Sequence, residues 1–282
     1  MSLESRIQQI IGESIRDLHP LQGGMVGKVY AATHADNQQI VVKISHTGTP
    51  TLHIEGQMLQ YLSEHSTLPV PKVLYHSPDL LIMDYVEGQS RFSTAGEQHA
   101  AELLADLHSH HADRYGLSFD TLIGSLHQPN TQSGSWIDFF RDQRLLHMTR
   151  AAYDAGQLMS ETQIKLNQLA SQLNDLLIEP DAPSLIHGDV WATNVLAKGD
   201  RITAFIDPAI YYAHPEIELA YITLFNTFGR PFFERYHTLK PIADGFFEVR
   251  RDIYNLYPLL VHVRLFGGGY EGSVRRILSR FV

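Results

Sequence analysis

Residues 184–212 read SLIHGDVWATNVLAKGDRITAFIDPAIYY, and this stretch decides the fold of the 282-residue chain. Its aspartates, Asp189 and Asp207, each follow an apolar run, and Asn194 lies between them. This pattern predicts two short strands that bring both carboxylates to one place, with a tight loop that carries the amide. Carboxylate and amide oxygens are hard ligands that suit Mg²⁺ when nucleotide phosphates complete its coordination.

The spacing of these three residues matches an order found in protein kinases, in which His-Arg-Asp, four residues, Asn and then Asp-Phe-Gly follow one another. In that pattern the first Asp is the base, and Asn and the second Asp hold Mg²⁺. Here four residues separate Asp189 from Asn194, and Asp207 stands where the second Asp belongs. The alternative is that the aspartates are strand-end turn residues and Asn194 caps a loop. The ordered set favours the kinase interpretation.

The composition narrows the class of protein. Net charge is −9 with histidine neutral, and no block of Lys or Arg occurs, which argues against nucleic acid and anionic membranes as partners. Without cysteine, neither disulfides nor thiolate chemistry is possible. Residues 1–14 predict an amphipathic helix and not a signal peptide, and no apolar run has membrane-spanning length, so we expect a cytoplasmic protein. The histidines, including His108, His110 and His111, are interpreted as surface and helix-end residues.

A lysine lies inside an apolar strand upstream. Residues 39–44 read QIVVKI, and Lys43 must find an anion or point out at the sheet edge. Kinases place such a lysine on the nucleotide phosphates and pair it with a helix glutamate. The helix predicted over residues 51–62 offers Glu55, for which solvent exposure is the alternative. A glycine-bearing turn at Gly24 could bring backbone N–H groups to phosphate, although an ordinary hairpin turn explains it as well.

The order of elements predicts an α+β protein with two lobes. Extended runs at 69–74 and 80–88 complete a small antiparallel sheet, so residues 1–85 form an N-terminal nucleotide-binding lobe. Residues 86–282 form a larger, mostly helical lobe that carries the catalytic and substrate-binding residues. Its helices are predicted near residues 95–110, 136–148, 160–178, 215–227, 246–264 and 271–281.

Three features are not explained by a nucleotide site. Residues 119–130 form a loop-like segment, and residues 265–270, LFGGGY, separate two helices by three glycines that suit a helix C-cap and turn. Trp191 follows the first aspartate by two residues. We expect its ring to face the cleft and pack on a sugar or a substrate carbon chain, and a core position is the alternative.

Residues 186–194, IHGDVWATN, resemble the Leu-His-Gly-Asp-Leu-Trp-Ser-Gly-Asn motif of the fructosamine kinases, or ketosamine-3-kinases. The resemblance continues in residues 123–130 (IGSLHQPN), 205–212 (FIDPAIYY) and 265–270, and spans nearly the whole chain. These kinases are relatives of the aminoglycoside phosphotransferases and share the bilobal protein-kinase-like fold.

The resemblance implies a role for each candidate residue. Asp189 would accept the proton of a sugar hydroxyl, and Asn194 and Asp207 would hold Mg²⁺. The remaining residues would bind ATP: Lys43 at the phosphates, Glu55 as its partner, and Asp84, Tyr85 and Val86 at the adenine. Two departures are visible, since Ala192-Thr193 replace the usual Ser-Gly and the phosphate loop at residues 25–28 is atypical.

The implied activity is an ATP- and Mg²⁺-dependent phosphorylation of the 3-hydroxyl of a ketosamine, which would serve the deglycation of proteins or metabolites. The partner would be a small ketosamine or another glycated amine, and the chain a monomer or weak homodimer. Three alternatives stay open. They are a kinase for another small alcohol, such as an aminoglycoside or a choline-type compound, a non-catalytic nucleotide-binding module, and a metal-dependent hydrolase.

Overall fold

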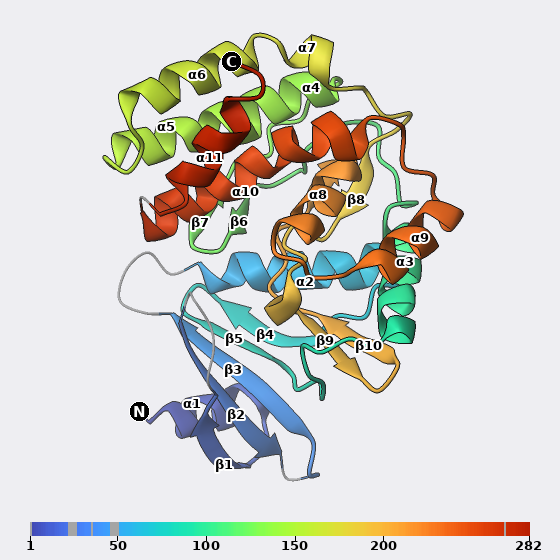
Figure 1. The fold of residues 1–282 in the computed structure, drawn as a ribbon. Coiled ribbons are helices and arrows are strands. Elements are labelled where there is room, and N and C mark those ends of the chain that lie inside the picture. Colours follow the sequence, from blue (N-terminus) through green and yellow to red (C-terminus); the bar gives the residue numbers. More distant parts are fainter. Residues whose placement is uncertain (1, 22–26, 35, 46–50, 268) are drawn as a thin grey trace.

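A five-stranded antiparallel sheet forms the N-terminal part of the chain (Figure 1), in the order β1-β2-β3-β5-β4. The computed structural model describes residues 2–21, 27–34, 36–45, 51–267 and 269–282. The strands are β1 (Ile15–Pro20), β2 (Gly27–His34), β3 (Gln39–Ser45), β4 (Val73–Ser77) and β5 (Leu80–Asp84). The predicted small antiparallel sheet is therefore confirmed, whereas a lobe boundary at residue 85 stays a prediction.

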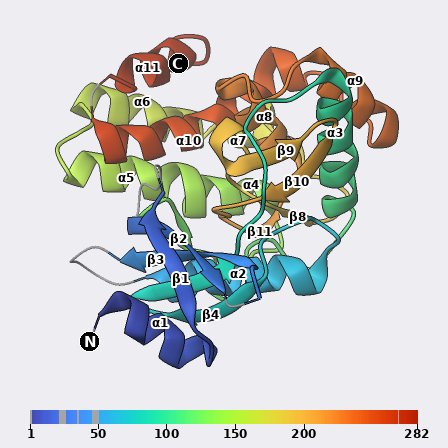
Figure 2. The same cartoon turned by 90° about the horizontal axis from the view of Figure 1, so that it is seen from below.

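Two helices cover opposite faces of this sheet, α1 (Leu3–Ile11) and α2 (Leu52–His65). Because side chains alternate along a strand, Ile40 and Val42 of β3 belong to the core that contains Ile7 of α1. The intervening residues, Val41 and Lys43, face α2. Figure 2 shows α1 lying along the outer side of the sheet. The period of the strand thus directs Lys43 toward the inner helix.

The C-terminal part is mostly helical and lies beyond α2 in Figure 1. Its main helices are α3 (Thr94–Leu107), α4 (Trp136–Phe139), α5 (His147–Asp154), α6 (Ser160–Ala170), α7 (Leu173–Leu176), α8 (Glu216–Leu224), α9 (Arg230–Leu239), α10 (Arg251–Phe266) and α11 (Glu271–Leu278). Its large core includes the fully buried Trp136, Phe205 and Tyr254. None of the helices in the described part of the chain is long and apolar enough to cross a membrane.

Four strands, and not the two predicted, build the stretch that carries the aspartates. β8 (Ser184–Ile186) pairs with β11 (Tyr211–Ala213), whereas β9 (Val195–Lys198) and β10 (Arg201–Phe205) form a separate hairpin. Gly199, with φ of +60°, and Asp200 form its two-residue turn, a conformation that glycine adopts without strain. Asn194 ends a short 3₁₀ turn immediately before β9.

Several helix predictions also need correction. The helix predicted over 136–148 continues to Asp154, through a π-helical segment at Phe140–Leu146. The one predicted over 160–178 breaks between α6 and α7. Helix α9 was not predicted, although the proline in its first turn and the spacing of Phe232, Tyr236 and Leu239 are both typical of a helix.

Candidate active site

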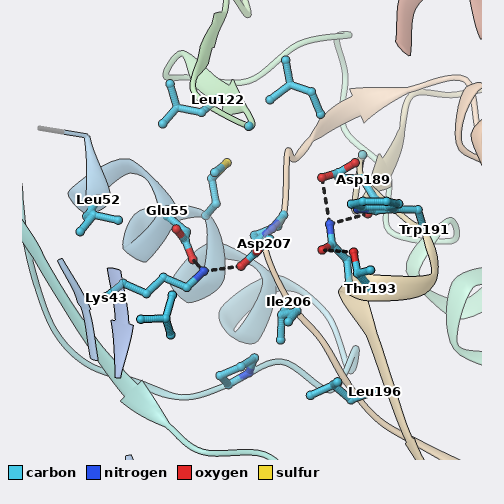
Figure 3. Close-up of a pocket in the computed structure, with 18 of the residues that line it drawn as sticks. Lys43, Leu52, Glu55, Leu122, Asp189, Trp191, Thr193, Leu196, Ile206 and Asp207 are labelled. Carbon is cyan, nitrogen blue, oxygen red and sulfur yellow. Dashed lines mark hydrogen bonds and ion pairs between the residues drawn. The ribbon is translucent and has the colours of Figure 1, made fainter. Parts of the chain in front are cut away.

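Lys43 connects the N-terminal sheet to both sides of a cleft. Its ammonium donates a hydrogen bond to Glu55 Oε1 of α2 over 2.6 Å and another to Asp207 Oδ1, which follows β10 (Figure 3). The side chains of Lys43 and Glu55 are each 12% exposed, and that of Asp207 is 37% exposed. The predicted pairing of Lys43 with Glu55 is confirmed, and Asp207 joins it.

The charge of this lysine is well stabilised. Burial alone would lower the pKa of Lys43, but attraction to Asp207 and Glu55 outweighs burial and raises the pKa above its ordinary value. The residue is therefore a fixed cation at neutral pH. A buried cation between two carboxylates is suited to meeting the anionic phosphates of a nucleotide at the same place.

The loop after β8 brings Asp189 and Asn194 together. Asn194 donates from Nδ2 to the Asp189 carboxylate over 2.9 Å and to the Asp189 carbonyl over 3.1 Å. The Ile206 N–H donates to the Asn194 carbonyl over 2.9 Å, so Asp207 lies next to this loop. Figure 3 shows Asp189 and Trp191 across the cleft from the Lys43–Glu55 pair. The structure thus brings together the residues that the sequence pattern selected.

The Asp189 carboxyl group is poised to exchange a proton near neutral pH. Burial raises its pKa to about 7. A hydrogen bond from the Tyr221 hydroxyl opposes this rise, the Asp207 charge adds to it, and the Asn194 hydrogen bond opposes it. A base with a pKa near the working pH is well matched to general base catalysis.

Backbone geometry holds the two aspartates in place. Gly188 has φ of +84°, and a β-carbon there would collide with the Ala209 carbonyl oxygen. Asp207 has φ of +53°, a left-handed conformation that is uncommon outside glycine and recurs at functional sites. The chain after β8 therefore packs directly against the chain after β10.

Glu218 of α8 stabilises the loop after β8 through hydrogen bonds. Its Oε1 accepts the Gly188 N–H over 2.6 Å, and its Oε2 lies 2.8 Å from His108 Nε2. His108 Nδ1 in turn lies 2.7 Å from the Tyr236 hydroxyl. The side chains of His108 and Glu218 are fully buried, so the interpretation of His108 as a surface residue is wrong. Its position at the C-terminal end of α3 was predicted correctly.

These residues line one cleft with a volume of about 520 Å³. One side holds Lys43, Glu55, Asp84 at the end of β5, and Tyr85 and Val86 directly after it. The other side holds Asp189 and a set of mainly apolar and aromatic side chains. These are Trp191, Leu122 and Ile123 of β6 (Thr121–Ile123), Tyr221 of α8, and Tyr257, Val261, His262 and Leu265 of α10. Gly24, predicted near the phosphates, lies outside the described residues.

The oxygens of Asn194 and Asp207 fit a magnesium site shared with a nucleotide. Since Nδ2 of Asn194 is turned to Asp189, its Oδ1 remains as the oxygen that could meet a metal. Asp207 uses Oδ1 for Lys43 and is exposed to the cleft. Within the described residues no group of three or more His, Asp or Glu side chains could hold a metal ion.

Sequence reasoning missed Glu218 and Tyr221 in the site. The available signal was Glu218 itself, a carboxylate within the otherwise apolar residues 217–222 of a helix, because a buried acid requires a hydrogen-bond partner. Tyr221 follows it by one helical turn, so the two side chains face the same loop.

Comparisons with known proteins identify the family of the chain. The family model for fructosamine kinase matches residues 1–282. The chloroplastic protein-ribulosamine 3-kinase of Arabidopsis thaliana is 30% identical over 271 residues, which cover 91% of this chain and 80% of that protein. A Thermobifida fusca crystal structure that is named as a fructosamine-3-kinase superposes with a TM-score of 0.87 at 29% identity and covers 99% of both chains.

A more distant likeness concerns the fold alone. The aminoglycoside phosphotransferase APH(4)-Ia, in ternary complex with ADP and hygromycin B, has a TM-score of 0.71 at 17% identity over 100% of this chain and 99% of that chain. The sheet, the helical region and the cleft between them have the arrangement of the protein-kinase-like fold. With the family match over its whole length, the chain belongs to the fructosamine kinase family.

Proposed function

We propose that the chain transfers the γ-phosphoryl group of ATP to the 3-hydroxyl of a ketosamine, with Mg²⁺ as the metal. Membership of the fructosamine kinase family supports the substrate class. The observation that carries the mechanism is that the Asp189–Asn194 pair and the Lys43–Asp207 pair line one cleft. A hydroxyl at Asp189 and a phosphate chain at Lys43 would meet between them.

In this mechanism Asp189 orients the substrate hydroxyl and accepts its proton as the oxygen attacks the γ-phosphorus. A bond forms between that oxygen and phosphorus, and the bond to the ADP oxygen breaks. Lys43 stabilises the negative charge of the phosphates, while Glu55 keeps the lysine in position. Catalysis then consists mainly of positioning and electrostatic stabilisation, as in other phosphoryl transfers.

Asn194 and Asp207 would hold the metal through their oxygens. Bound Mg²⁺ supplies charge neutralisation to the transferred phosphoryl group. The backbone at the end of β5 and directly after it, at Asp84, Tyr85 and Val86, would meet the adenine, and Trp191 would pack on the sugar adduct. Phosphorylation of the 3-hydroxyl would destabilise the adduct and release the free amine, which makes deglycation the expected role. The cytoplasmic location and a monomeric or weakly dimeric state stay predictions.

The charges at the substrate side favour a ketosamine over a polycation such as an aminoglycoside. The carboxylates that line this side are Asp189 and Glu218. Asp189 is hydrogen-bonded to Asn194, and Glu218 to Gly188 and His108. Glu218 is fully engaged, and Asp189 is the base that faces the reacting hydroxyl, so this side offers no group of free carboxylates to a polycation among the described residues.

The test is phosphoryl transfer from ATP with Mg²⁺ to ribulose and fructose adducts of lysine, with the phosphate position assigned by NMR. Asp189→Asn should lower kcat by on the order of 10²-fold or more. The exposed Asp113→Asn is the matched control and should retain the rate. ATP binding without transfer to any ketosamine would refute the substrate class.

A further inference from the structure

Five aromatic rings form a continuous series from the catalytic loop to the surface, and we refer to them as the aromatic wall. They are Trp191, Phe225, His262, Phe266 and Tyr270. Trp191 and Phe225 have ring centroids 5.9 Å apart, and Phe225 and His262 lie 5.0 Å apart. His262 then contacts Phe266 at 5.6 Å and Tyr270 at 4.9 Å. Phe266 is 54% exposed, so the wall reaches solvent.

The aromatic wall borders the cleft on the side away from Lys43. Trp191 and His262 line the cleft directly, together with Val261 and Leu265 of α10. The facing surface comes from Leu122 and Ile123 at the end of β6 (Thr121–Ile123), beside β7 (Leu126–Gln128). Figure 1 shows this hairpin next to α10. We refer to the part of the cleft lined by Leu122, Ile123, Val261 and Leu265 as the channel, and these four side chains are apolar.

His262 does not bring charge to this channel. Its Nδ1 lies 2.7 Å from the Pro258 carbonyl oxygen, which can only accept, so Nδ1 carries the hydrogen. Burial lowers the pKa of the imidazole below its ordinary value, so the ring is neutral at pH 7. The side chain thus acts as an aromatic surface whose other nitrogen, Nε2, is an acceptor.

The chemistry of a ketosamine places its amine near the aromatic wall. In a ketosamine the nitrogen is bonded to C1 and the reacting hydroxyl to C3, so only three carbons separate the two groups. With the hydroxyl at Asp189, the amine must lie close to Asp189. The nucleotide would occupy the side of Lys43, so the group attached to the amine extends toward Trp191 and α10.

We propose that Trp191 and His262 of the aromatic wall, together with Val261 and Leu265, form a binding subsite for an uncharged aliphatic group on the ketosamine nitrogen. This inference rests on the proposed function. An uncharged aliphatic group matches the apolar side chains on both sides of the channel. A cationic group would find no free counter-ion in Asp189 or Glu218, because each already accepts a hydrogen bond within the protein. The four-carbon stem of a glycated lysine side chain has this chemistry.

The test compares fructose adducts of methylamine, n-hexylamine and 1,6-diaminohexane in the wild-type enzyme. The hexylamine adduct should have a KM at least about 10-fold lower than the methylamine adduct, because several methylenes are buried. The diaminohexane adduct, with a terminal cation, should bind more weakly than the hexylamine adduct. Equal KM values for the methylamine and hexylamine adducts would overturn the subsite.

Substitutions of residues that line the cleft at the subsite distinguish direct contact with the alkyl group from a general structural role. His262→Ala and Leu265→Ala should each raise the KM of the hexylamine adduct by roughly 5- to 10-fold. They should leave the KM of the methylamine adduct and the KM of ATP within about twofold, since neither ligand reaches the channel. The exposed Phe247→Ala, which lies outside the cleft, is the matched control and should change none of these values.

Two outcomes have different meanings. If Leu265→Ala, the milder change, raises KM equally for the methylamine and hexylamine adducts, or for neither, the subsite is refuted while the ketosamine kinase function stands. If the wild-type enzyme phosphorylates none of the adducts, the proposed function itself fails.

Discussion

Asn194 donates a hydrogen bond from Nδ2 to the Asp189 carboxylate over 2.9 Å. This contact fixes which end of the amide faces the base and which end, Oδ1, remains for a metal. It also joins two functions in one loop, because a shift of the amide would move the base and the metal ligand together.

Asn194→Ala should therefore affect both roles. We expect kcat to fall by on the order of 10²-fold and the Mg²⁺ concentration for half-maximal rate to rise. Steady-state rates over a magnesium series measure both quantities. The exposed Asn167→Ala on α6 serves as the control. A rise in the magnesium requirement with kcat unchanged at saturation would show that the amide does not position Asp189.

Removal of the Lys43 charge should cost more stability than removal of the Glu55 charge. Lys43→Met leaves Glu55 and Asp207 without the cation between them, and we expect a loss of about 3 kcal/mol in the free energy of unfolding. Glu55→Gln leaves Lys43 paired with Asp207 and should cost about 1 kcal/mol. Urea denaturation at pH 7 without nucleotide measures both. Equal losses would contradict the sharing of the lysine.

Gly188→Ala should disrupt the loop that carries the base. The φ of +84° and the nearby Ala209 carbonyl both oppose a β-carbon, so we expect a loss of more than about 2 kcal/mol in the free energy of unfolding. Gly134→Ala is the control, because a β-carbon there has no neighbour within 4 Å. Thermal unfolding of both variants decides whether the loop tolerates the change.

The contribution of neutral His214 to stability should be lost as the pH falls below about 6.5. Burial, followed by the Arg250 charge, lowers the pKa of His214 to about 3. Between this value and its ordinary pKa of about 6.5, the unfolded state binds more protons than the folded state, so acid favours unfolding by up to about 1.4 kcal/mol per pH unit.

His214→Gln removes this proton uptake. The loss of stability between pH 6.5 and pH 4.5 should be smaller in this variant than in the wild type, by roughly 1 to 2 kcal/mol. Denaturation curves at several pH values measure the slope. The exposed His65→Gln should keep the wild-type slope, and an unchanged slope in His214→Gln would show that His214 is already protonated in the folded state.

Much of the fold was readable because its signals are local. The apolar alternation of residues 39–44 predicts β3 and identifies Lys43 as an unusual insertion, and the spacing of Asp189, Asn194 and Asp207 is a property of one continuous stretch. Such local signals predict a contact between distant segments only where a buried charged residue requires a partner, as Lys43 requires Glu55.

The remaining features depend on tertiary packing. The bond from Gly188 to Glu218 spans 30 residues, and that between His108 and Glu218 spans 110. No periodic pattern encodes either contact. The π-helical segment at Phe140–Leu146 could not be predicted from the sequence either. Its residues are ordinary helix formers, and the wider π-helical turn depends on tertiary packing.

The position of Lys43 between Glu55 and Asp207 has a consequence for nucleotide binding. One ammonium faces two carboxylates there, so Asp207 already has a counter-ion within the protein. A nucleotide that arrives with its divalent metal would bring both a new anion for the lysine and a new cation for the aspartate. Binding would then be an exchange of partners, and metal-free ATP, which offers only half of that exchange, should bind more weakly.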